Sequence, residues 1–70
     1  MEIEFTNHAI EKLNRRKFMK HEIIEAINNP DKTLKKHGKY YYQKKLDRGS
    51  VEIVCEKTEK IIKVVTLYWL

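Results

Sequence analysis

Pro30 divides this sequence into two parts whose apolar residues repeat with different periods. Before Pro30, apolar residues recur three and four positions apart, which is typical of helices with one buried side. From Thr33 onward the spacing changes to two, which is typical of strands, because successive side chains of a strand point to opposite faces. Helices followed by strands predict an α+β fold.

Two helices are predicted in the first part, over about residues 7–16 and 20–28. The first begins where Thr6 or Asn7 can accept the amide hydrogens of an opening turn. The second ends near Asn29, because the proline that follows restricts that residue away from helical angles. Each helix has one apolar side, as expected for a helix that packs on a core.

Four strands are predicted in the second part, with the sequences KTLKKH, KYYYQKKL, VEIVCEK and IIKVVTLYWL. The short polar turns between them predict an antiparallel meander. Two helices cover only one face of such a sheet, so we expect two N-terminal helices packed on one face of a four-stranded antiparallel sheet, with the other face open. The alternation in MEIEF adds a short N-terminal strand with Ile3 and Phe5 on one side.

The same alternation assigns side chains to the two faces of the sheet. The inward set is expected to be Tyr40, Tyr42, Leu46, Val51, Ile53, Cys55, Val65, Leu67 and Trp69. The outward set is expected to include Tyr41, Gln43, Lys45, Glu52, Val54, Val64, Thr66 and Tyr68. The tyrosine triplet is therefore divided, with two rings facing inward and one facing outward.

The charge of the chain favours a negatively charged partner. Fifteen Lys and Arg against ten Asp and Glu give a net charge of +5, with the excess in residues 12–20 and 32–48. Nucleic acid is the commonest partner of such a surface. Each base that stacks on an aromatic ring contributes about 1–3 kcal/mol to binding, while neighbouring lysines neutralise the phosphates. The predicted nucleic-acid-binding residues are Lys12, Arg15, Tyr41 and Lys45. A solvated helix face and a lysine-protected strand explain the same residues without a ligand.

Length and cysteine content restrict the class of protein. Seventy residues fit one domain over 1–70. A small secreted domain normally has paired cysteines, so the single Cys55 predicts a cytoplasmic protein. No basic-then-apolar signal pattern and no apolar run of roughly 20 residues is found, so a membrane role is not expected. Without metal-ligand spacing or a phosphate-binding loop, no metal and no cofactor are expected.

The first helix carries a basic ridge formed by His8, Lys12 and Arg16, which are spaced four residues apart. His8 lies in the first turn, where the helix dipole disfavours its charged form and leaves it able to act as a base. RNA cleavage without a metal needs a base, an acid and cations, which His8, Tyr68 and either Arg16 or Lys45 supply by residue type. A surface histidine is the commoner case, so catalysis is left open.

The segments HAIEKLNRRKF and EIIEAINNP, followed by a tyrosine strand and VVTLYWL, resemble a small prokaryotic family known as domain of unknown function 4258. That family is similar in turn to the RelE and ParE-like toxins and to the barnase, EndoU and colicin nuclease group. The resemblance implies helices on one side of an antiparallel sheet and a metal-independent ribonuclease. It places the family's histidine at His8, its basic helix residues at Lys12 and Arg16, and its terminal-strand threonine at Thr66.

Three positions depart from the family pattern. Lys12 stands where arginine is usual, Lys17 where glycine is usual and Met19 where a capping serine is usual. Lysine keeps the charge at position 12 but loses the planar fork that grips a phosphate with two hydrogen bonds. The second helix is expected to start without a good cap.

Two functions follow from this reading. The first is a small basic toxin-like module that binds RNA. If it also cleaves RNA without a metal, the expected catalytic residues are His8, Arg16, Thr66 and Tyr68. The second is a non-catalytic protein-interaction module, either a homodimer through the C-terminal strand or the partner of an antitoxin-like protein. IIKVVTLYWL is apolar on both faces and should lie at an edge, where it pairs with a second chain or with MEIEF of its own chain.

Overall fold

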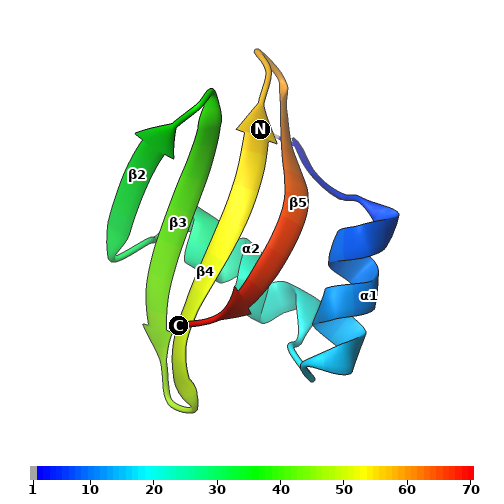
Figure 1. The fold of residues 1–70 in the computed structure, drawn as a ribbon, viewed down its shortest axis with the longest axis vertical. Helices are drawn as coiled ribbons and strands as arrows, with labels where there is room; N and C mark the ends of the chain where they lie inside the picture. Colours follow the sequence, from blue (N-terminus) through cyan, green and yellow to red (C-terminus); the bar gives the residue numbers. More distant parts are fainter. Residues whose placement is uncertain (1) are drawn as a thin grey trace.

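The computed structural model describes residues 2–70 as a twisted sheet with two helices (Figure 1). In chain order the elements are β1 (Glu2–Phe5), α1 (Asn7–Arg15), α2 (Lys20–Asn28), β2 (Lys32–Lys36), β3 (Lys39–Leu46), β4 (Gly49–Lys57) and β5 (Ile61–Trp69). The strand order is β1-β5-β4-β3-β2. Strands β2 to β5 form the predicted antiparallel meander, and β1 joins it parallel to β5. The α+β class and the N-terminal strand are confirmed, and β1 makes the sheet five-stranded and mixed.

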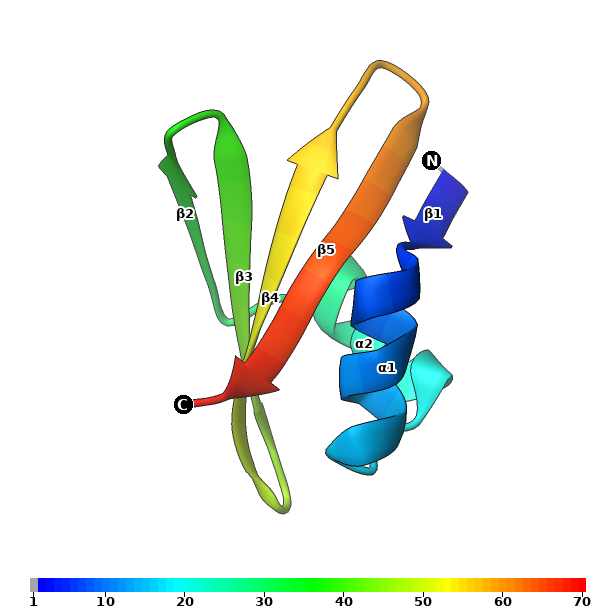
Figure 2. The ribbon, with the colours of Figure 1, turned by 45° about the vertical axis from the view of Figure 1, so that its right-hand side comes forward.

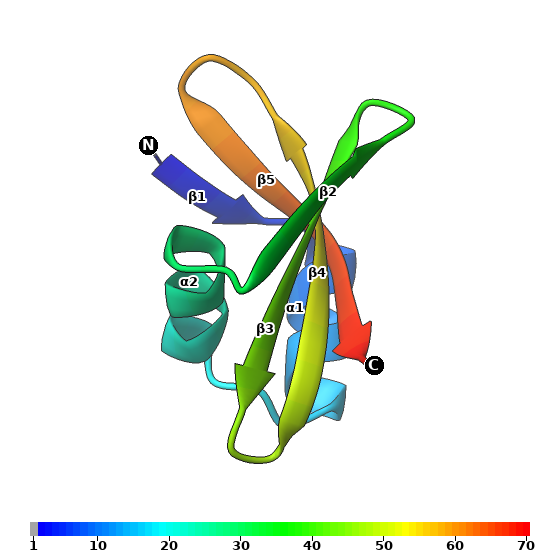
Figure 3. The same ribbon diagram turned by 90° about the vertical axis from the view of Figure 1, so that its left-hand side faces the viewer.

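The helices leave one face of the sheet uncovered. α1 packs against β5 and α2 against β3. Figure 1 looks onto the uncovered face, with α2 behind β4, and Figure 3 shows α2 on one side of the sheet only. We call the uncovered side, which carries Tyr41, Glu52 and Tyr68, the open face. Neither helix within residues 2–70 is long and apolar enough to cross a membrane.

The core lies between the helices and the inner face of the sheet. Its helical members are Ala9, Leu13, Ile23, Ala26 and Ile27, and its sheet members include Val51, Ile53, Cys55, Val64 and Leu67. The predicted inward residues of β3 and β4 are confirmed, since they either belong to this core or pack against it. Burial raises the pKa of the Cys55 thiol to about 12, so this cysteine stays protonated and unreactive at neutral pH.

α1 begins after Thr6, one of the two residues predicted to cap it. The Thr6 Oγ1 atom accepts a hydrogen bond from the backbone N–H of Ala9 at 3.0 Å. The same hydroxyl donates to the carbonyl oxygen of Val65 at 3.1 Å. One side chain therefore satisfies the helix start and fixes it to β5.

β5 departs from the predicted alternation at Val65. Val54 lies opposite Thr66, whereas the next residue of β4, Cys55, lies opposite Val64. Val65 is therefore an extra residue in β5, which is the definition of a β-bulge. The prediction that Val64 faces outward and Val65 inward is wrong, because the bulge shifts the alternation by one residue.

The bulge allows both halves of β5 to bury apolar side chains on the same side of the sheet. Before the bulge, Ile62 and Val64 are buried in the core. After it, Leu67 is buried and Trp69 packs against the same cluster. Apolar residues therefore occur at both odd and even positions of this strand, although only one of its faces is covered by helices.

β5 is not an edge strand, so that part of the sequence prediction is wrong. β1 pairs with its first half, Ile61–Val64. Beyond the bulge, the Arg16 guanidinium donates a hydrogen bond to the carbonyl oxygen of Leu67 at 3.0 Å. Pairing with MEIEF inside one molecule is confirmed. Arg16, at the end of α1, hydrogen-bonds the part of the strand that β1 does not reach.

A cluster around Arg48 joins the connection between the helices to the turn between β3 and β4. The rings of Phe18 and Trp69 lie 4.3 Å apart, and the Arg48 guanidinium lies 5.5 Å from the Trp69 ring. The same guanidinium donates to the carbonyl oxygen of Lys17 at 3.0 Å and to the carboxylate of Glu22 at 2.6 Å. Stacking and hydrogen bonds thus fix one arginine between three elements.

α2 starts at Met19 without a side-chain cap, as predicted. Glu22 compensates in part, because its carboxylate accepts the backbone N–H of Met19 at 2.8 Å. This hydrogen bond, together with Arg48, holds the pKa of Glu22 below its usual value. The arrangement supplies one half of a reciprocal capping box.

Lys17 adopts a left-handed backbone conformation, with φ of 58°, at the position where the family pattern usually has glycine. A residue with a Cβ atom is strained there by about 1–2 kcal/mol. We predict that Lys17→Gly raises the free energy of unfolding in urea by roughly 0.5–1 kcal/mol, because it relieves this strain. The gain is smaller than the strain itself, since glycine loses more chain entropy on folding. Lys17→Ala is the matched control, because it removes the side chain but keeps Cβ. An equal gain in the alanine variant would show that backbone strain is not the cause.

Candidate nucleic-acid interface

The strand register places three rows of side chains across the open face. The polar row, across β2 to β5, is Lys32, Gln43, Glu52 and Tyr68. The tyrosine row beside it is Leu34, Tyr41, Val54 and Thr66. The charged row, toward the turn between β2 and β3, is Lys36, Lys39, Glu56 and Lys63. Side chains in the same or neighbouring rows are close enough to contact one ligand.

Glu52 organises the polar row. Its Oε2 atom accepts a hydrogen bond from the Gln43 amide at 2.6 Å, and its Oε1 atom accepts one from the Tyr68 hydroxyl. The hydrogen bond to Glu52, followed by burial, raises the pKa of Tyr68 to about 12. The Tyr68 proton is therefore held by a carboxylate at neutral pH and is poorly placed to act as a general acid.

Lysines lie against tyrosine rings on both faces of the hairpin formed by β2 and β3. On the open face, the Lys36 ammonium lies 6.0 Å from the centre of the Tyr41 ring. On the helix side, Lys35 and Lys57 lie 5.3 and 5.4 Å from the centre of the Tyr40 ring. None of these three lysines forms an ion pair within residues 2–70. Figure 2 shows that the turn end of this hairpin extends away from both helices.

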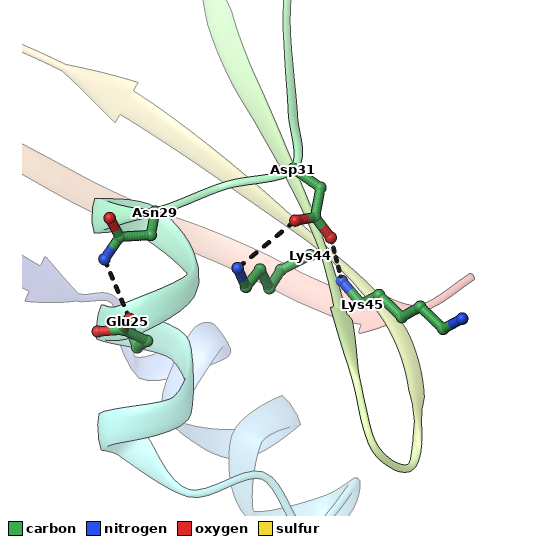
Figure 4. Close-up of polar contacts among 5 residues, drawn as sticks. All are labelled: Glu25, Asn29, Asp31, Lys44 and Lys45. Atoms are coloured by element: carbon green, nitrogen blue, oxygen red, sulfur yellow. Dashed lines mark hydrogen bonds and ion pairs between the residues drawn. The ribbon is translucent and has the colours of Figure 1, made fainter.

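Lys45 lies at the opposite end of the open face, beside a hollow. Its backbone N–H donates to the Asp31 carboxylate at 2.7 Å, and the Lys44 ammonium lies 3.5 Å from the other oxygen of Asp31 (Figure 4). The Lys45 side chain points away from Asp31 (Figure 4). The hollow has a volume of about 160 Å³ and is lined in part by Lys32, Gln43 and Lys45. It therefore combines positive charge with one end of the polar row.

The predicted catalytic residues are brought together only in part. Arg16 reaches the carbonyl oxygen of Leu67, which lies in sequence between Thr66 and Tyr68. His8 is exposed, about two helical turns from Arg16, and forms no hydrogen bond or ion pair in the described part of the chain. The structure thus brings Arg16 to the backbone of β5 between Thr66 and Tyr68, with no contact to either side chain among residues 2–70, and leaves the histidine without a polar partner there.

The other basic residues predicted on α1 differ in their surroundings. Arg15 forms an ion pair with Glu11 at 2.7 Å, with side chains 60% and 59% exposed. Such an exposed pair contributes little to stability and is easily opened by a competing anion. Lys12 is half-buried and has no ion-pair partner among residues 2–70. Within the same residues, no group of three or more His, Cys, Asp or Glu side chains is placed to hold a metal ion.

Sequence reasoning missed the roles of Glu52 and of the lysines on the tyrosine rings. Alternation places Glu52 on the outward face, but its partners depend on the register of three strands. Lys36 and Lys57 lie beside tyrosines only because β2 and β4 flank β3. A register derived from the turn at His37 and Gly38, both of which have positive φ, would have found the first of these contacts.

The fold and the open face define a small α+β domain whose exposed sheet surface combines tyrosines, lysines and one hydrogen-bonded carboxylate. A family model described as Domain of unknown function (DUF4258) matches residues 5–69. The chain therefore belongs to this family, which confirms that part of the resemblance. A search of curated proteins and a search of solved structures each found no match.

The hydrogen bond between Tyr68 and Glu52 predicts a specific alkaline behaviour. Because the folded-state pKa of Tyr68 is raised from its usual 10.0 to about 12, its contribution to stability is complete below about pH 10 and lost as the pH rises to about 12. We predict that Tyr68→Phe removes one late step, the ionisation near pH 12, from the titration of tyrosine followed by phenolate absorbance. The free energy of unfolding of the variant should also fall less steeply over this window.

Tyr41→Phe serves as the control, because this tyrosine lies on the same face and forms no hydrogen bond with Glu52. The late step should persist in that variant. A late step that also persists in Tyr68→Phe would contradict the assignment.

Proposed function

We propose that this protein is a small toxin-like module that binds single-stranded RNA on the open face of its sheet. Kinship of the family with the RelE and ParE-like toxins is part of the same proposal. It is supported by two N-terminal helices ahead of an antiparallel meander with one uncovered face. Fold alone does not choose an activity, so the function is argued from the surface.

The observation that carries the proposal is that lysine ammonium groups lie over two tyrosine rings of β3. Lys36 lies over Tyr41 on the open face, and Lys35 and Lys57 lie over Tyr40 on the other face. At Tyr41, the ring and the Lys36 ammonium lie together, so a base stacked on the ring brings its phosphate close to the cation. Single-stranded RNA suits this surface because its unstacked bases are free to pack on aromatic side chains.

Charge is also separated across the open face. The lysines at its β2 and β3 side, such as Lys32 and Lys36, lie two or more strands away from the carboxylates of Glu2 and Glu4 on β1. A polyanion is therefore attracted to the β2–β3 side and repelled from the β1 edge. This charge distribution supports a position of the RNA over Tyr41 and Gln43.

We predict that the affinity for a short uridine RNA, measured by fluorescence anisotropy, falls as salt is raised. The slope of log affinity against log salt is about −0.7 for each phosphate neutralised. Lys36→Gln should weaken binding and reduce the magnitude of that slope by about 0.7. An affinity that does not change with salt would overturn the proposal.

Lys44→Gln is the matched control for this measurement. It removes the same charge, but the Lys44 ammonium already lies beside Asp31 and is less available to a phosphate. We expect a smaller change in slope than for Lys36→Gln. Equal changes would point to net charge alone rather than to the tyrosine–lysine site.

The geometry supports binding better than cleavage. The Tyr68 proton is held by Glu52, the Arg16 guanidinium is bound to a backbone carbonyl, and His8 has no polar partner in the described residues. We predict that the protein leaves bound RNA intact on a denaturing gel in the presence of a chelator, and that His8→Ala binds RNA equally well. Cleavage that is lost in His8→Ala would restore the endoribonuclease hypothesis.

The alternative, a protein-interaction module, needs a different surface from the one that the sequence indicated. The outer side of β5 is occupied by β1 and by Arg16, so the reason to expect a homodimer through that strand no longer applies. The outer edge of β2 carries Lys32, Lys35 and Lys36, which protect an edge against pairing. An antitoxin-like partner is therefore not favoured by a specific contact.

A further inference from the structure

We infer that the polar row reads the Watson–Crick edge of a guanine in the bound RNA. The inference rests on the proposed RNA binding and names the base that the open face prefers. It is carried by the hydrogen bonds of Glu52 with Gln43 and Tyr68, together with the hollow beside them.

The unused hydrogen-bonding capacity of this group consists mainly of acceptors. Gln43 directs its amide nitrogen at Glu52, so its carbonyl oxygen is the atom left to accept. The Tyr68 hydroxyl gives its proton to the same carboxylate and keeps an accepting oxygen. Glu52 itself has two oxygens with about four accepting positions, of which these bonds use two. A ligand that fits here must supply several N–H donors.

Guanine is the base that supplies adjacent donors on one edge, from its N1–H and its 2-amino group. A carboxylate binds two such parallel N–H groups with charge-assisted hydrogen bonds, as it binds a guanidinium. Adenine and cytosine each present an amino group beside an accepting ring nitrogen, which the carboxylate repels. Uracil presents one N–H between two carbonyls. The acceptor group of Glu52 therefore discriminates for guanine and against the other three bases.

Neighbouring residues supply the remaining contacts of a nucleotide. Tyr41 lies one row away, on the same face as Gln43 and Glu52, where its ring can stack on a base. The hollow beside Gln43 is lined by Lys32, Lys44 and Lys45 and by Asp31, so positive charge exceeds negative charge around it, which suits a phosphate. Base, stacking ring and phosphate site thus lie within one part of the open face.

An arginine side chain of a protein partner offers the same pair of N–H donors. The chain has a net charge of +5, and Lys32 stands beside Gln43 in the polar row. An incoming guanidinium is repelled by this charge, whereas the phosphates of RNA are attracted to it. Guanine is therefore the occupant that the surroundings favour.

The test compares uridine RNAs of equal length that carry one central guanine, inosine, adenine or no purine, by fluorescence anisotropy at fixed salt. We expect guanine to bind roughly tenfold more tightly than adenine, in line with one good bidentate contact. Inosine lacks the 2-amino group and should fall between them. Glu52→Gln should abolish the preference for guanine while uridine RNA binds at least as well, because a negative charge is removed.

Glu56→Gln is the matched variant. It removes the same negative charge from the open face but lies in the charged row and leaves Glu52, Gln43 and Tyr68 in place, so the preference for guanine should persist. Circular dichroism establishes that each variant is folded. Should Glu52→Gln fail to fold, the comparison of guanine, inosine and adenine on the unaltered protein still decides the question.

The outcomes separate this inference from the proposed function. Salt-dependent binding with equal affinity for guanine and adenine overturns the guanine site and leaves RNA binding in place. Absence of binding to every RNA overturns both. Displacement of the guanine RNA by arginine amide but not by guanosine monophosphate assigns the polar row to an arginine of a protein partner and overturns the inference.

Discussion

The open face depends on the β-bulge at Val65. Without an extra residue there, a strand that buries Leu67 and Trp69 would turn Ile62 and Val64 outward, onto the side without helices. Exposing two such aliphatic side chains costs about 1.5–3 kcal/mol each, and the surface would be apolar and prone to association. The bulge keeps both halves of β5 packed on one core and leaves the other side to polar residues and tyrosines.

The bulge also divides the protection of the outer side of β5 between two elements. The half before it is paired with β1, and the half after it is capped by α1 through Thr6 and Arg16. β1 has four residues and pairs only with Ile61–Val64, so it does not reach the half of β5 beyond the bulge. Arg16 therefore has a structural role at a position where the family resemblance places a basic helix residue.

Much of the fold follows from local signals in the sequence. The change of period at Pro30 and the cap at Thr6 predict the helices, and strict alternation predicts the faces of β3 and β4. The faces of β5 could not be assigned in this way. Val64 and Val65 are equally apolar, so the sequence pattern does not show that Val65 is an extra residue. The pairing of β1 with β5 joins residues about 60 positions apart in the chain, and only the folded structure selects it.

The candidate site shows the same division. Alternation alone places Tyr41, Gln43 and Tyr68 on the open face, because each of these assignments requires only the strand that carries the residue. The contacts of Glu52 require the register of β3, β4 and β5 together, and those of Lys36 require the hairpin turn. Arg48 lies in a turn, and its stacking on Trp69 depends on the last strand returning to that turn. Properties of single strands are therefore predictable here, and properties of strand pairs are not.

A carboxylate at the centre of a basic surface has a physical consequence for any polyanion bound there. Glu52 opposes the attraction of the lysines, and it is held in place by Gln43 and Tyr68 rather than neutralised by a cation. A surface that only gathers phosphates gains nothing from such a group, because each negative charge weakens binding to every sequence alike. A ligand with N–H donors at that point offsets this cost, so in the proposed complex the lysines account for affinity and Glu52 for the choice of base.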